Sequence, residues 1–151
     1  MATTAADPVF IDTNVLIYAS RPAAPQHQAA REALAHLEAR DSRLSVSRQV
    51  LREYLAVVTR PHNSTPALPM SVAIADVRKF QSLFDVADDN QEVLEGLLQL
   101  LETYPGAGKQ VHDANPVATM LAHGVHRLLT FNGRDFQRFA GLIELEPLPL
   151  A

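Results

Sequence analysis

The chain has 151 residues, of which 47% are apolar and 20% charged, and it contains no cysteine. These values fit one folded domain, and they exclude a disulfide framework, a thiolate metal centre and an intrinsically disordered chain. The net charge of −4 argues against coating nucleic acid through bulk charge. Because no secretory signal or membrane-spanning run is recognisable, we expect a protein of the cytoplasm without membrane contacts.

The first predicted elements alternate strand and helix. Residues 9–11 form a continuous apolar run, which is typical of a buried parallel strand, and residues 14–19 then begin a helix or a turn. Apolar residues recur at helical spacing over residues 26–40, which predicts an amphipathic helix. Residues 43–46 fit a second short strand.

The middle of the chain predicts two helices separated by a loop. Ser47 is placed to cap a helix over residues 48–60, and Pro61 would stop it. Further prolines make residues 62–70 a loop. The next helix is expected to begin with Ser71 as its cap.

A short strand and two more helices are predicted next. Residues 85–87 fit the strand, and Asp89 or Asn90 could cap a leucine-rich helix that runs to Glu102. Residues 112–123 again show helical periodicity.

The last elements are a strand over residues 127–131, a turn with a short helix over 133–139 and a strand over 142–145. Strands thus alternate with helices along the whole chain, and no repeat or linker interrupts them. This alternation predicts one domain over residues 1–151, with its core at about 8–147. The expected fold is a three-layer α/β/α architecture with a central, mostly parallel sheet.

Acidic side chains stand near the predicted carboxyl ends of the strands, where open parallel sheets bind their ligands. Asp12 directly follows the first strand, and Asp113 is expected to open a helix. Asp135 comes four residues after Phe131, the last residue of a predicted strand. A fourth acid, Glu53, lies inside a predicted helix.

Each acid also has an ordinary explanation. Glu53 could lie on the solvated face of its helix, although Val50 and Val57 share its side. Asp113 could stabilise a helix N-terminus, and Asp135 could belong to a turn. Four such coincidences are less expected than one shared site.

A cluster of carboxylates needs a cation, because neighbouring negative charges repel each other and raise one another's pKa. Mg²⁺ and Mn²⁺ take oxygen ligands and relieve this repulsion. Such an ion can activate water and orient a phosphodiester. The sequence does not choose between one ion and two.

The segments that carry these acids resemble the motifs of a known family. They are, in chain order, FIDTNVL (residues 10–16), SRQVLREY (47–54), VHDAN (111–115) and LTFNGRDF (129–136). Their order and content resemble the PIN-domain ribonucleases, in particular the VapC-like toxins of bacterial toxin–antitoxin modules. The resemblance spans roughly residues 8–147 and includes all four acids.

The resemblance implies cleavage of RNA phosphodiester bonds that depends on Mg²⁺ or Mn²⁺. It implies Asp12 and Asp113 as the firmest metal ligands, with Glu53 and Asp135 completing the catalytic pocket. It also implies a homodimer and a cognate antitoxin that occludes the site. The residues expected to orient the pocket are Thr13, Asn14 and Asn132. The candidates for holding the RNA backbone are Arg48, Arg52, Lys109, Arg134 and Arg138.

One position departs from the family pattern. Pro116 stands where the family more usually has an aliphatic residue. If Asp113 lies near the start of its helix, Pro116 falls in the first turn, where a missing N–H costs little. His112 is left out of the catalytic set, because a histidine at a strand end is more often structural.

Other classes of function fit less well. A haloacid-dehalogenase-like phosphoaspartate enzyme needs a second aspartate at the position of Asn14, and no phosphate-binding P-loop is present. The serious alternative is a PIN-like protein-binding module with little or no nuclease activity, in which the leucine-rich helix contacts a partner. The presence of all four acids argues against this alternative.

Overall fold

Five short strands form one parallel sheet in the computed structural model of the chain, which describes residues 7–149. The outer ends of the predicted domain, residues 1–6 and 150–151, lie outside the described residues. The strands are β1 (Val9–Ile11), β2 (Leu44–Ser47), β3 (Asp85–Ala87), β4 (Arg127–Leu129) and β5 (Glu144–Leu145). Their order in the sheet is β3-β2-β1-β4-β5, and all four pairings are parallel.

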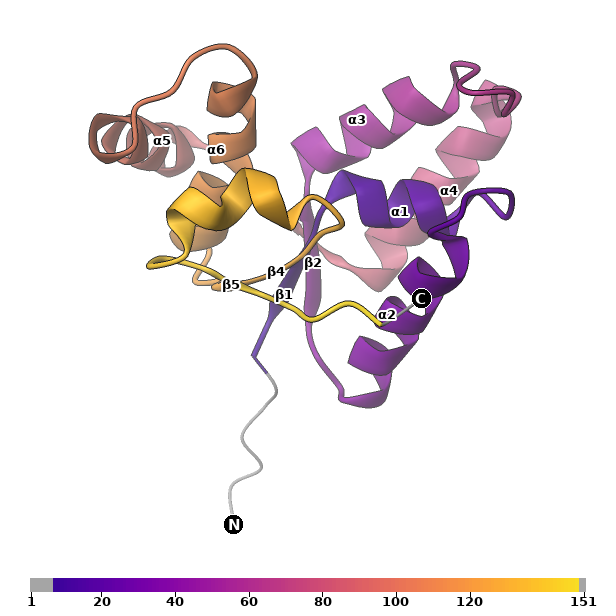
Figure 1. The fold of residues 1–151 in the computed structure, drawn as a ribbon, viewed down its shortest axis with the longest axis horizontal. Coiled ribbons are helices and arrows are strands. Elements are labelled where there is room, and N and C mark those ends of the chain that lie inside the picture. The colour runs from indigo at the N-terminus through magenta and orange to yellow at the C-terminus, as the bar shows by residue number, and fades with distance from the viewer. Residues whose placement is uncertain (1–6, 150–151) are drawn as a thin grey trace.

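Helices cover both sides of this sheet, which confirms the predicted α/β/α class. The helices α1 to α4 lie together on one side, and α5 and α6 lie on the other, with the 3₁₀ helix η1 beside α6 (Figure 1). Their bounds are α1 (Thr13–Ala19), α2 (His27–Ala39), α3 (Arg48–Val58), α4 (Met70–Leu83), α5 (Gln91–Thr103), α6 (Lys109–Ala122) and η1 (Gly133–Phe139). None of the helices within the described range is long and apolar enough to cross a membrane.

Burial on both faces explains the apolar runs of the strands. Every residue of β1 has no solvent exposure, and Val46 of β2 and Leu128 of β4 are equally buried. Tyr54 of α3 is the largest fully buried side chain, and it donates a hydrogen bond of 2.6 Å to Asp76 of α4. The core therefore lies between the sheet and the helices on each face, as the alternating pattern predicts.

Several element boundaries differ from the predicted ones for local reasons. The strand expected over 127–131 ends at Leu129, because the N–H of Phe131 is bonded to the side chain of Asn14 instead of a neighbouring strand. Ser71 does not cap α4, which begins at Met70, directly after Pro69, and has no side-chain cap. The predicted cap Ser47 is confirmed, since its hydroxyl accepts from the N–H of Val50.

The helix expected over 112–123 begins earlier, at Lys109, so two sequence-based expectations are wrong. Asp113 is the fifth residue of α6 rather than its opening residue. Pro116 is the eighth residue and lies buried inside the helix, not in its first turn. Gly108, with φ of 56°, provides the left-handed turn that lets the helix start here. Because proline has no N–H, the carbonyl of His112 lacks its usual helical partner.

The direction of chain progression reverses at β1. From β1 the chain moves to β2 and β3 on one side, and it later places β4 and β5 on the other side. The carboxyl ends of β1 and β4 are therefore the switch point at which open parallel sheets form their ligand crevices.

Candidate active site: an acidic cleft

A cleft of about 510 Å³ opens at this switch point, and all four predicted acids line it. Asp12 follows β1, Glu53 comes from α3, Asp113 from α6 and Asp135 from η1. Four elements that are distant in sequence thus each contribute one carboxylate to a single cleft.

Asp12 is held at the base of the cleft by three donors. It is the N-cap of α1, and its Oδ1 accepts from the N–H of Thr13 at 2.8 Å. Its Oδ2 accepts from the hydroxyl of Thr130 at 2.8 Å and from the amide of Asn14 at 3.2 Å. These bonds fix the orientation of the carboxylate before any ligand arrives.

Asn14 ties α1 to the segment that follows β4. Its Nδ2 donates to Asp12 and to Thr130, and its Oδ1 accepts from the N–H of Phe131 at 3.0 Å. The hydroxyl of Thr130 also accepts from the N–H of Asn132 at 3.0 Å. The side chain of Asn132 lines the cleft. Asn14 therefore connects Asp12 to the segment after β4, and Asn132 is bonded to the same segment through its backbone N–H.

Glu53 is exposed, as its ordinary explanation predicts, yet its carboxylate belongs to the cleft. Its Oε2 accepts from the hydroxyl of the buried Thr13 at 2.8 Å, and its Oε1 accepts from Nε2 of Gln49 at 2.9 Å. Each carboxylate oxygen thus has one neutral donor.

Asp113 and Asp135 occupy the opposite wall. Nζ of Lys109 lies 3.6 Å from Oδ2 of Asp135, and both side chains are exposed, so this ion pair contributes little to stability. The location of Lys109 matters more than the strength of this ion pair, because Lys109 lines the same cleft as the four carboxylates.

Two of the acids have raised pKa values. Burial raises the pKa of Asp12, hydrogen bonds from Thr130 and Thr13 lower it, and the charges of Glu53 and Asp113 raise it. Burial also raises the pKa of Asp113. Lys109 and Arg138 lower that pKa, while Asp135 and Glu53 raise it. The carboxylates therefore destabilise one another's charged forms across the cleft.

The predicted RNA-backbone cations lie in different surroundings. Lys109 lines the cleft, while Arg52 and Arg134 are exposed neighbours of two of its acids. Arg48 forms an ion pair of 2.9 Å with Asp88. Arg138 donates to the carbonyls of Tyr104, Pro105 and Gln110, so its guanidinium holds the α5–α6 loop.

Sequence reasoning missed three polar residues of the site. Thr130, Gln49 and Asn115 were each inside a motif, but none was given a role. Thr130 follows an apolar strand at the switch-point edge, and that position was the available signal. Gln49 and Asn115 meet at 2.7 Å although 66 positions separate them, so no local pattern could have paired them.

The donor set suits a hard divalent ion, because every acidic ligand candidate offers oxygen. Within residues 7–149, no three His, Asp or Glu side chains stand close enough together to form a ready-made metal site. Mg²⁺ commonly binds through one or two carboxylates and keeps several waters, so Asp12 and Asp113 fit this requirement. Burial is the main cause of the raised pKa of both groups, and the charges of neighbouring acids raise the two pKa values further.

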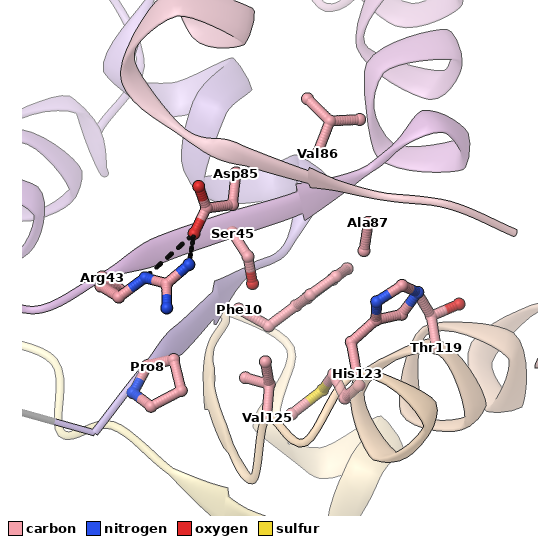
Figure 2. A pocket seen from close by; sticks show the side chains of 11 residues that line it. Pro8, Phe10, Arg43, Ser45, Asp85, Val86, Ala87, Thr119, His123 and Val125 are labelled. Atoms are coloured by element: carbon pink, nitrogen blue, oxygen red, sulfur yellow. Dashed lines mark hydrogen bonds and ion pairs between the residues drawn. The ribbon is translucent and has the colours of Figure 1, made fainter.

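A second, smaller hollow of about 170 Å³ contains none of the four acids (Figure 2). It lies between the sheet and α6, and an ion pair of 2.7 Å between Arg43 and Asp85 closes one side. The hydroxyl of Ser45, a residue only 7% exposed, points into it without a hydrogen-bond partner among the described residues. Other side chains that line it are Phe10, Ala87, Thr119, Met120 and His123.

The fold and the cleft define an α/β/α domain with an acidic site at the topological switch point. The PIN domain family model matches residues 9–142, and the chain belongs to this family. The resemblance read from the four motifs is thereby confirmed.

Solved structures with the same fold include a toxin and a toxin–antitoxin complex. The chain is similar to one in the VapBC2 complex of Rickettsia felis bound to promoter DNA, at 20% identity and a TM-score of 0.67, covering 93% of this chain and 98% of that one. It is similar to VapC20 of Mycobacterium tuberculosis, a toxin that cleaves the sarcin–ricin loop, at 21% identity and a TM-score of 0.66, covering 92% and 99%. It is also similar to a chain of FitAcB of Neisseria gonorrhoeae, at 18% identity and a TM-score of 0.67, covering 92% and 96%. At these identities the likeness shows the fold alone. No curated protein sequence matches the chain.

Proposed function

We propose that the chain is a ribonuclease that depends on Mg²⁺ or Mn²⁺ and is the toxin of a type II toxin–antitoxin module. The observation that carries this proposal is the convergence of Asp12, Glu53, Asp113 and Asp135 on one cleft at the switch point. Membership of the PIN domain family supports it, and so does the likeness to toxins such as VapC20.

Asp12 and Asp113 would hold the ion, with Glu53 and Asp135 as further ligands, hydrogen-bond acceptors or a base. A bound divalent ion would supply an activated water and would offset the charge of the scissile phosphate. Thr13 and Asn14 would keep the carboxylates of Glu53 and Asp12 in place through the hydrogen bonds described above.

Basic residues near the acids would suit a phosphate backbone better than a small neutral substrate. Lys109 lines the cleft, and Arg52 and Arg134 are exposed and stand next in sequence to Glu53 and Asp135. Arginine and lysine contacts to phosphate position a nucleic acid without reading its sequence. Phosphate contacts alone do not distinguish RNA from DNA, and the PIN domain family and the likeness to VapC20 favour RNA, which we place in the cytoplasm. The cleavage site would then be chosen largely by RNA shape.

A cognate antitoxin and a second copy of the chain are the proposed partners. Toxin–antitoxin complexes among the similar structures support the antitoxin. Exposed apolar side chains on α4 and α5 are the candidate contacts with these partners, because apolar surface that is grouped on a protein often marks an interaction site. They are Met70, Val72, Ile74 and Leu83 on α4, and Leu94 and Leu98 on α5.

The test is cleavage of RNA by the purified chain with Mg²⁺, with Mn²⁺ and with EDTA. Asp12→Asn and Asp113→Asn remove one charge each, and asparagine preserves the N-cap at position 12. Glu102→Ala is the matched control, because Glu102 is an exposed acid at the end of α5 and does not line the cleft.

We expect cleavage that needs a divalent ion, that both asparagine variants lose while folded, and that the Glu102 variant retains. Cleavage that persists in EDTA or in both asparagine variants would refute the proposed site. Absence of both cleavage and metal binding in the wild-type chain would favour the protein-binding module instead.

A further inference from the structure

Glu53 reaches the cleft from an exposed helical position, so its side chain needs to be held there. A glutamate has several rotatable bonds, and an exposed one loses side-chain entropy when it is fixed. Thr13 holds one carboxylate oxygen, and Gln49, one turn earlier on α3, holds the other. Thr13 is buried and lies next to Asp12, so the role of Gln49 is the less evident of the two.

Gln49 is itself fixed by a partner on the other side of the sheet. Its Oε1 accepts from Nδ2 of Asn115 at 2.7 Å, and Asn115 also donates to Oδ2 of Asp89 at 3.2 Å. Each amide therefore donates its N–H groups toward a carboxylate, Gln49 to Glu53 and Asn115 to Asp89, and the oxygen of Gln49 accepts from Asn115. A flipped amide at Gln49 would place oxygen against the carboxylate of Glu53 and lose both bonds.

This chain of hydrogen bonds joins the two walls of the cleft. Gln49 and Glu53 belong to α3, and Asn115 belongs to α6, two residues after Asp113. α3 and α6 lie on opposite sides of the sheet (Figure 1). The bond between Gln49 and Asn115 thus fixes the position of the Glu53 carboxylate relative to the helix that carries Asp113.

We propose that Gln49 is a positioning residue, which together with Asn115 holds Glu53 in the orientation that the metal site requires. The inference rests on the proposed function and adds a role that none of the four acidic motifs assigns. A neutral donor suits this position, because it orients a carboxylate without adding negative charge to the cleft. A lysine here would instead form an ion pair that competes with the metal.

The experiment measures Mn²⁺ affinity by electron paramagnetic resonance, a readout that does not require RNA cleavage. It compares the wild-type chain with Gln49→Leu, Glu53→Gln and the double variant. Gln28→Leu is the matched control, because Nε2 of Gln28 donates to Oε1 of Glu32 at 2.8 Å with the same four-residue spacing on α2. Circular dichroism confirms that each variant is folded.

We expect Gln49→Leu to weaken Mn²⁺ binding by about 10-fold to 100-fold, the usual effect of removing a group that orients a metal ligand. In the Glu53→Gln background the same change should have no further effect, because Gln49 acts through Glu53. If Gln49→Leu acted only by destabilising a helix, its effect on Mn²⁺ binding would add to that of Glu53→Gln in the double variant. Gln28→Leu would then weaken Mn²⁺ binding as well.

Two other outcomes separate this inference from the proposed function. If Glu53→Gln weakens Mn²⁺ binding and Gln49→Leu does not, the positioning role is wrong and the metal site stands. If the wild-type chain binds no Mn²⁺, the proposed function is wrong, and the positioning role is overturned with it.

Discussion

Thr130→Val removes a single hydroxyl from the base of the cleft and keeps the branched shape of the side chain. The hydroxyl donates to Oδ2 of Asp12 at 2.8 Å and accepts from Nδ2 of Asn14 at 3.2 Å and from the N–H of Asn132 at 3.0 Å. Thr130 is only 4% exposed, so water would not readily replace these bonds. The substitution therefore affects folding stability and the chemistry of Asp12 together.

The expected loss of folding free energy follows from these three bonds. A hydrogen bond to a charged group contributes about 1.5–3 kcal/mol, and a buried N–H left without a partner costs about 1–3 kcal/mol. Because such terms overlap, we expect a total of about 3 kcal/mol for Thr130→Val. For a chain of this size the melting temperature should fall by about 6–12 °C.

Thermal unfolding of the metal-free protein measures this loss, and Thr119→Val provides the matched control. Thr119 is 1% exposed, and its hydroxyl makes one neutral bond, to the carbonyl of Asn115 at 2.9 Å. Its loss should cost about 1 kcal/mol. Equal losses of folding free energy in the two variants would show that the hydrogen bond from Thr130 to the charged Asp12 contributes no more than an ordinary neutral one.

The same substitution should change the pH dependence of metal binding. The hydrogen bond from Thr130 lowers the pKa of Asp12, so its removal raises that pKa further. A metal ligand must be deprotonated, and the variant should therefore bind Mn²⁺ most weakly at low pH and approach the wild type as pH rises. A defect of constant size across pH would refute this explanation.

Two further predictions concern groups whose environment is unfavourable in the folded chain. Burial raises the pKa of Asp12 and Asp113 above 3.8, so the folded state binds these protons more tightly than the unfolded chain does. Their contribution to stability is complete below that value and is lost as pH rises through the raised folded values. Without metal, the melting temperature of the wild type should therefore fall relative to an Asp12→Asn/Asp113→Asn variant as pH rises from 4 to 7, and a constant difference would contradict this. Ser45→Ala removes a buried hydroxyl that has no partner among the described residues, so urea unfolding should show no loss, or a gain of up to about 1 kcal/mol. A loss larger than this would mean that the hydroxyl is hydrogen-bonded.

The fold was predictable because its three central strands, β2, β1 and β4, are largely buried between the helices on the two faces of the sheet. The segments of β1 and β2 are short and buried, and neither contains a glycine or a proline that would indicate a loop. Ser47 marks the start of α3, because its hydroxyl caps that helix. Asp12 and Asp135 were predictable as members of one site, because parallel strands end at the same edge of a sheet. Position relative to a strand end is a local property, and one sequence is sufficient to recognise it.

The parts that could not be predicted depend on contacts between distant segments. The strand β4 is shorter than its apolar pattern because Asn14 captures the N–H of Phe131 across 117 positions. The start of α6 depends on a positive φ at Gly108. Glycine adopts positive and negative φ about equally readily, so the sequence alone does not predict its backbone conformation in a loop. The error placed Asp113 at a helix end, where its charge would be stabilised, instead of inside the helix.

The position of Asp113 inside α6 supports the assignment of the cleft as a ligand site. At the first turn of a helix Asp113 would have an ordinary stabilising role, whereas at the fifth position it has no such role, and burial raises its pKa. Asp12 is different, because it is a genuine N-cap, but its second carboxylate oxygen is held by Thr130 and Asn14 rather than by the helix. In both cases the fold places the carboxylate in the cleft that the other acids also line, although their repulsion lowers stability. A cation in the cleft would remove this penalty, and the stability of the metal-free chain should therefore be lower than that of the chain with Mn²⁺ by an amount that grows as pH rises.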